Sequence, residues 1–131
     1  MLRRTFFSLF TGLLLAGMVG LTGCGGSDRP PLGQVTGTVT LDGQPLVGVN
    51  IIFSPDDGRA AAATTDAEGK YELQYLADAK GCKVGPNTMY LEWPPEAEDA
   101  VPIPAGYTSA TGQKVEVKEG SNVIDFPIKS E

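Results

Sequence analysis

The chain has 131 residues, with 16 acidic side chains against 10 basic ones and no histidine. Without histidine, a Ser-His-Asp triad, a Cys-His pair and a histidine-bearing zinc site are excluded. The acidic charge disfavours binding to nucleic acid and electrostatic docking on anionic lipids. The length predicts a single domain.

The first residues have the layout of a bacterial export signal. Arginines at positions 3 and 4 precede an uncharged apolar run from Phe6 to Leu21, as in a signal peptide. The run ends in Leu21-Thr22-Gly23-Cys24, which matches the lipobox of bacterial lipoproteins. We therefore expect a lipoprotein signal peptide over residues 1–23, cleavage between Gly23 and Cys24, and lipidation of Cys24 with acyl chains such as palmitate. An uncleaved membrane span is the alternative, although about 16 apolar residues are fewer than the roughly 17–25 of a span.

Residues 24–33 predict a flexible tether, because they contain glycine and proline and show no periodicity. Removing the two arginines of the signal leaves 8 basic residues against 16 acidic ones, so the lipid is expected to hold the protein at the membrane. Gly25 follows the lipidated position, where aspartate signals retention in the inner membrane of many bacteria. The outer membrane is therefore favoured, within an expected location in the cell envelope.

Two further features of the sequence concern export and redox chemistry. Arg3-Arg4-Thr5-Phe6-Phe7 resembles part of a twin-arginine signal, but an ordinary signal peptide is the favoured interpretation. Lipidation of Cys24 leaves Cys82 as the other cysteine of the chain, so no disulfide within the mature protein is expected. We expect Cys82 to be a small semi-buried residue and not a reactive thiol.

From Gln34 onward, apolar residues alternate with polar ones at a period of two, which is typical of half-buried strands. Turn sequences separate the alternating segments, among them Asp42-Gly43, which favours a hairpin, and Asp66-Ala67-Glu68-Gly69. Pro127 predicts that the last strand lies at a sheet edge or points that position to solvent. Seven strands are expected, in residues 34–41, 47–54, 59–65, 70–76 and 88–93, with two more within 114–129. The sequence predicts an all-β, seven-stranded antiparallel β-sandwich over residues 34–131, with Ig-like architecture.

Three segments carry a resemblance to a known family. They are Gly37-Thr38-Val39, the stretch DGQPLVGVNI at 42–51 and the stretch TDAEGKYEL at 65–73. They resemble the carboxypeptidase regulatory-like domain, a seven-stranded transthyretin-like (prealbumin-like) sandwich. Gly85-Pro86-Asn87-Thr88 stands where that family often has a Gly-x-Tyr entry to its fifth strand. The resemblance implies a module without catalytic activity, because the regulatory-like domain is the non-catalytic partner of such enzymes.

The remaining candidates for a site are carboxylates and aromatic rings. Asp66 to Gly69 and the acidic group Glu96, Glu98 and Asp99 could be read as calcium ligands, but a tight turn and solvated charge account for them more simply. The alternation of side chains places several aromatic residues in the core, together with Leu73, Met89 or Leu91, and ordinary packing is the favoured interpretation for them. Trp93 and Tyr107 flank a proline-rich loop, and they are the candidate platform for a ligand.

These observations predict a non-catalytic, lipid-anchored module of the cell envelope that presents its loops to a protein or glycan partner. No catalytic residue, cofactor or metal is expected. The alternative is a purely structural envelope lipoprotein with no specific ligand.

Overall fold

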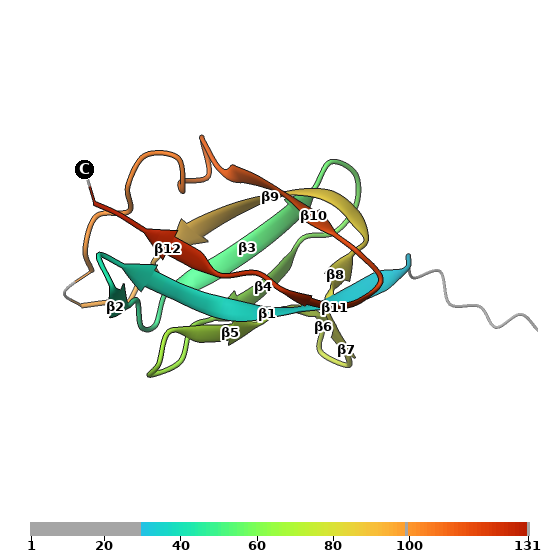
Figure 1. Ribbon diagram of the computed structural model, residues 1–131, viewed down its shortest axis with the longest axis horizontal. Coiled ribbons are helices and arrows are strands. Elements are labelled where there is room, and N and C mark those ends of the chain that lie inside the picture. Colours follow the sequence, from blue (N-terminus) through green and yellow to red (C-terminus); the bar gives the residue numbers. More distant parts are fainter. Residues whose placement is uncertain (1–29, 99, 131) are drawn as a thin grey trace, which may run out of the picture.

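The computed structural model describes residues 30–98 and 100–130. The expected signal peptide, its cleavage site, Cys24 and Asp99 lie outside this part of the chain. The described residues form an all-β structure of two sheets (Figure 1), so the expected class is confirmed. Within them, no helix has the length and apolar character needed to cross a membrane.

Twelve strands are found in the described residues, against the seven expected, because several extended segments are divided between two sheets or continue as two- and three-residue strands. The strands are β1 (Leu32–Leu41), β2 (Gln44–Pro45), β3 (Asn50–Pro55), β4 (Ala61–Thr64), β5 (Lys70–Glu72), β6 (Gln74–Leu76), β7 (Ala79–Lys80), β8 (Cys82–Lys83), β9 (Gly85–Glu92), β10 (Gln113–Val117), β11 (Gly120–Val123) and β12 (Phe126–Ile128).

The first sheet is built around β1, the longest strand. Along one edge, β1 pairs in antiparallel fashion with β8, β5 and β2 in turn. Along the other edge it pairs with β11 and β12, and these two pairs are parallel. The antiparallel arrangement expected from the sequence therefore holds for one edge of β1 and not for the other. β1 begins at Leu32, two residues before the expected start of the domain, because Leu32 and Gly33 pair with Lys83 and Cys82.

The second sheet has the strand order β10-β9-β3-β4-β6-β7, and all of its pairs are antiparallel. Its central pair, β3 with β9, has an unbroken register from Asn50 opposite Glu92 to Pro55 opposite Asn87. β9 alternates as expected, since Met89 and Leu91 are buried, whereas in β3 Ile52 is buried as well as Ile51 and Phe53. Val47, expected on the same face, is 49% exposed because β3 begins only at Asn50.

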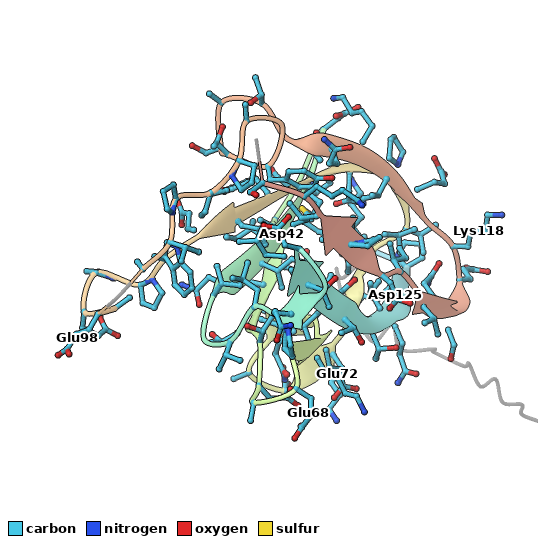
Figure 2. The ribbon with its side chains drawn as sticks, turned by 60° about the vertical axis from the view of Figure 1, so that its left-hand side comes forward. Asp42, Glu68, Glu72, Glu98, Lys118 and Asp125 are labelled. Atoms are coloured by element: carbon cyan, nitrogen blue, oxygen red, sulfur yellow. The ribbon has the colours of Figure 1, made fainter. Side chains whose placement is uncertain are left out.

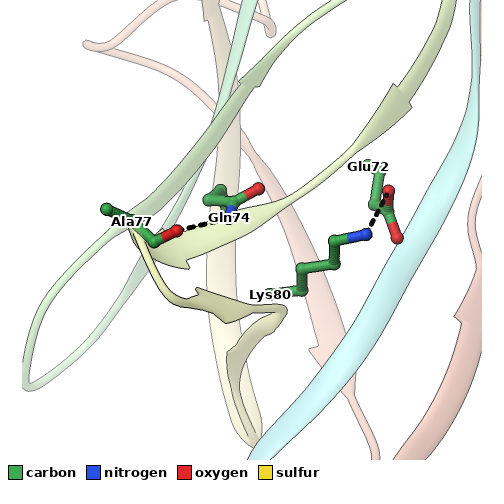
Figure 3. A network of polar contacts seen from close by, with 4 residues as sticks. All are labelled: Glu72, Gln74, Ala77 and Lys80. Carbon is green, nitrogen blue, oxygen red and sulfur yellow. Dashed lines mark hydrogen bonds and ion pairs between the residues drawn. The ribbon is translucent and has the colours of Figure 1, made fainter.

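The turn from Asp66 to Gly69 is formed as expected, but it is not a hairpin. It connects β4 of the second sheet with β5 of the first. The following segment, expected as one strand, also changes sheet at Leu73, where β5 ends and β6 begins. Figure 3 shows the β6–β7 region, where Gln74 Nε2 donates to Ala77 O at 3.4 Å and Lys80 forms an ion pair with Glu72 at 3.5 Å. Because both charged side chains are about half exposed, this ion pair contributes little to stability.

The core lies between the two sheets. Phe53 comes from the second sheet, while Tyr71 and Phe126 come from the first, and their three ring centroids are 6.2–6.4 Å apart. The Tyr71 hydroxyl donates to Ile124 O at 2.6 Å, which pairs the polar end of a buried ring. The other buried side chains of this core are mainly aliphatic: Val35, Val39, Leu46, Val49, Ile51, Ala61, Leu73, Met89, Leu91, Val117 and Ile128.

The two ends of the domain differ in what they carry. The described chain enters at the start of β1, and β1 then runs for 10 residues, or about 30 Å at roughly 3.3 Å per residue, to the turn at Asp42. Figure 1 shows this second end on the left, with β2, the long orange loop and the C-terminus. We call it the distal end, because it lies at the opposite end of β1 from Leu32.

Candidate functional site

The turn after β1 is the first element of the candidate site. Asp42 and Gly43 both adopt positive φ angles, 54° and 83°, as the Asp-Gly sequence predicts for a tight hairpin turn. The partner strand is only β2, two residues long, so the hairpin is shorter than the pattern suggested. Asp42 N donates to Ile128 O at 2.8 Å, which fixes the turn to the last strand.

The C-terminal segment holds the carboxylate of this turn. Ser130 Oγ donates to Asp42 Oδ2 at 2.6 Å, and Ser130 N donates to Asp42 Oδ1 at 2.9 Å. These hydrogen bonds lower the pKa of Asp42, and the positive charge of Lys129 lowers it further. Asp42 is therefore ionised at neutral pH, and it presents a fixed negative charge at the distal end.

The second element is the long loop between β9 and β10, whose shape depends on the two aromatic residues singled out in the sequence. The Trp93 indole Nε1 donates to Val101 O at 2.6 Å, which closes the segment between them. Tyr107 O accepts from Leu91 N at 2.8 Å, and Tyr107 N donates to Pro104 O at 3.2 Å. Both side chains are half-buried and pack against the core. Trp93 and Tyr107 therefore anchor the loop.

Turn and loop together enclose a groove of about 440 Å³, a volume within the range of small-ligand sites. We call it the distal groove. Figure 2 brings this end of the molecule forward, with Asp42 near the centre of the view and Glu98 on the projecting part of the loop. Its lining comes from the turn, the loop and the C-terminal segment: Leu41, Asp42, Val101, Pro102, Ile103, Pro104, Ala105 and Ser130.

The chemistry of the distal groove is that of binding. Six of its eight lining residues are apolar, and its polar groups are the Asp42 carboxylate and Ser130. Trp93 and Tyr107 are not among the lining residues, so the expected aromatic platform does not form the groove itself. These two residues position the loop segment that lines the groove. The sequence pointed to the loop that lines this groove, but it carried no signal for the contribution of Asp42 or Ser130.

Among the carboxylates considered as calcium ligands, Asp66 has hydrogen-bond partners in its own turn. Asp66 Oδ1 accepts from Glu68 N at 2.9 Å and from Lys70 N at 2.8 Å, and Gly69 has a φ of 78°. These contacts are those of a turn-forming aspartate, as expected from the sequence. Within residues 30–98 and 100–130, no group of three or more His, Cys, Asp or Glu side chains is placed to hold a metal ion.

Cys82, on β8 of the first sheet, is part of the core between the two sheets. Its side chain is fully buried, and Sγ donates to Asn87 Oδ1 at 3.3 Å. Burial raises the pKa of the thiol to about 11, while a hydrogen bond with the backbone of Lys83 acts in the opposite direction. A thiol with such a pKa is a poor nucleophile at neutral pH.

A second depression, of about 490 Å³, lies over β1 and β5. Its lining contains charges of both signs, Lys70 with Glu72 and Asp125, and it has little apolar floor beyond Tyr71 and Val123. The distal groove is therefore the better candidate for a binding site. Comparison of the chain with protein-family models, curated proteins and solved structures finds no match.

Proposed function

We propose that the chain is a non-catalytic, lipid-anchored module of the cell envelope that presents its distal groove to a protein or glycan partner. The lipid is attached to Cys24, residues 1–23 are then removed, and the outer membrane is the favoured location. The domain that follows is a transthyretin-like β-sandwich of the carboxypeptidase regulatory-like type. The lipid and the tether then hold one end of the domain, and the groove lies at the other.

The observation that carries this proposal is the direction in which β1 runs, from the anchored end of the domain to the distal groove. A chain anchored through residues before Leu32 enters the domain at one end, and the groove opens about 30 Å away, beside the turn at Asp42. A partner therefore reaches the groove without approaching the bilayer. The all-β fold and the conventional turn role of Asp66 agree with a binding module, although neither one selects a partner.

Site-specific photo-crosslinking in living cells tests the proposal. A photoreactive phenylalanine analogue replaces Val101 in the distal groove, and in a matched variant it replaces Val123, which is 74% exposed on β11. We expect one defined adduct from position 101, none from position 123, and loss of the adduct when unlabelled chain is overproduced. A purely structural lipoprotein predicts the same diffuse background at both positions, and that result would refute a specific partner.

A further inference from the structure

We infer that the occupant of the distal groove is a protein segment that places a lysine or arginine beside aliphatic side chains. This inference rests on the proposed function and narrows the partner to one chemical class. It is drawn from the charge, the hydrogen-bonding groups and the apolar residues of the groove lining.

The charge of the site calls for a cation. The loop from Trp93 to Gly112 contains Glu96 and Glu98 and has no lysine or arginine in its sequence. Within the lining itself, the one charged group is Asp42, an exposed carboxylate that accepts two hydrogen bonds from Ser130. Lys129 lies beside a neighbouring depression that Asp42 also lines. The Asp42 carboxylate therefore has no cation within the groove, and an occupant can supply one.

The hydrogen-bonding groups also favour a donor. A carboxylate offers about four acceptor positions, and the two bonds from Ser130 use two of them. The prolines at 102 and 104 have no N–H to offer. The carbonyl oxygens of Val101 and Pro104 already accept from Trp93 and Tyr107. Main-chain pairing along this loop is thus limited, and recognition falls to side chains.

The apolar residues of the groove lining favour aliphatic side chains next to the cation of the occupant. Leu41, Val101, Ile103 and the two prolines present aliphatic surface, and Val101 is 40% exposed. No aromatic ring is among the lining residues, so a sugar would find no face on which to stack. Burial of aliphatic side chains against such a floor contributes about 25 cal/mol per Å² of apolar surface. A peptide with aliphatic residues around one cation satisfies both features.

The test begins with a peptide selection that assumes nothing about the sequence of the ligand. A phage-displayed library of random dodecapeptides is selected on the full-length lipoprotein in detergent micelles, and in parallel on the chain carrying Asp42→Asn. Asparagine tolerates a φ of 54° and keeps hydrogen-bonding capacity toward Ser130, so this variant removes the charge and retains the turn. We expect peptides from the unmodified chain to be enriched in lysine or arginine next to Leu, Ile, Val or Pro. Selection on the variant is expected to lose the enrichment in cations.

The strongest peptide is then measured by fluorescence polarisation. Replacing its lysine with glutamine is expected to weaken binding to the unmodified chain at least tenfold and to have little effect with Asp42→Asn. Val101→Ser is expected to weaken binding at least fivefold, whereas Asp57→Asn and Val123→Ser, on other surfaces, leave it unchanged.

Three results would overturn the inference. They are recovery of uncharged or acidic peptides, a lysine preference that survives Asp42→Asn, and failure to enrich any peptide while chito-oligosaccharides bind in a manner that Val101→Ser abolishes. A specific adduct at position 101 in cells combined with any of these results would leave the proposed function in place and remove only the peptide class.

Discussion

Gly69 tests how closely the turn between the sheets must approach β1. Its φ of 78° is in the left-handed region, and Gly69 O accepts from Val39 N at 2.8 Å. A Cβ at this position would lie 2.6 Å from Val39 O and 3.1 Å from the Cβ of Pro45. The Gly69→Ala variant must therefore accept a strained φ and also move the turn away from β1.

The expected loss of stability has two parts. The left-handed conformation costs a side chain roughly 1–2 kcal/mol. Displacing the turn weakens the Val39 N to Gly69 O hydrogen bond, whose net contribution is about 0.5–1.5 kcal/mol. The sum is about 1.5–3.5 kcal/mol. Gly43→Ala is the matched control, because Gly43 has a φ of 83° but a Cβ added there would meet no atom within 4 Å. It should cost only the first part.

Urea unfolding of the purified chain measures both variants, with fluorescence of Trp93, the one tryptophan of the sequence, as the signal. We expect Gly69→Ala to be about 0.5–1.5 kcal/mol less stable than Gly43→Ala at an unchanged dependence on urea. The general effect of alanine on the unfolded chain is the same in both and cancels. Equal losses for the two variants would show that the close approach to β1 carries no energetic weight, and our account of this turn would be refuted.

Three further predictions concern other parts of the chain. Replacing Cys24 with serine should release the protein from membranes and prevent processing to the mature mass; unchanged fractionation at the processed mass contradicts lipidation. In the native protein Cys82 should resist iodoacetamide at pH 8 and react after unfolding in urea, as mass spectrometry can follow, because burial raises its pKa to about 11; rapid native labelling contradicts this. Ser130→Ala should lower stability at pH 7, because Ser130 depresses the pKa of Asp42 in the folded state. That contribution is present above the unfolded pKa of about 3.9 and is lost as the pH falls through the folded value, so the variant and the parent should converge in acid; a difference independent of pH contradicts the linkage.

The alternation of side chains predicted the buried residues well, but it did not predict which strands are neighbours. Tyr71 and Leu73 are buried as expected, and Tyr75 is half-buried. Yet Tyr71 belongs to the first sheet and Tyr75 to the second, because the chain crosses at Leu73. A period of two identifies the inward face of a strand, and both sheets present that face to the same core. The pattern is therefore identical on either side of a crossing.

Turn chemistry has the same limit. The Asp66–Gly69 sequence predicts a reversal of the chain, and the reversal is present with its positive φ at Gly69. Whether the next strand pairs with the preceding one is decided by long-range contacts, here the pairing of β5 with β1. The parallel pairs of β1 with β11 and β12 join residues more than 80 positions apart, and nothing local encodes them. The expected edge position of Pro127 was confirmed, because β12 pairs only with β1 among the described strands and Pro127 is exposed.

The loop beside the distal groove contains polar residues, but the residues that it contributes to the groove lining are apolar. A connection of about 20 residues without regular structure is uncommon in a compact domain and is often functional. Here its polar groups are used within the loop: Gln113 Nε2 donates to Gly106 O at 2.7 Å, and Gly106 N donates to Thr111 Oγ1 at 3.2 Å. The Trp93 indole holds Val101 O in the same way. These bonds fix the shape of the loop, and aliphatic residues of the loop line the groove. If a partner binds there as we propose, binding would order little of the protein, and more of the contact energy would remain for affinity.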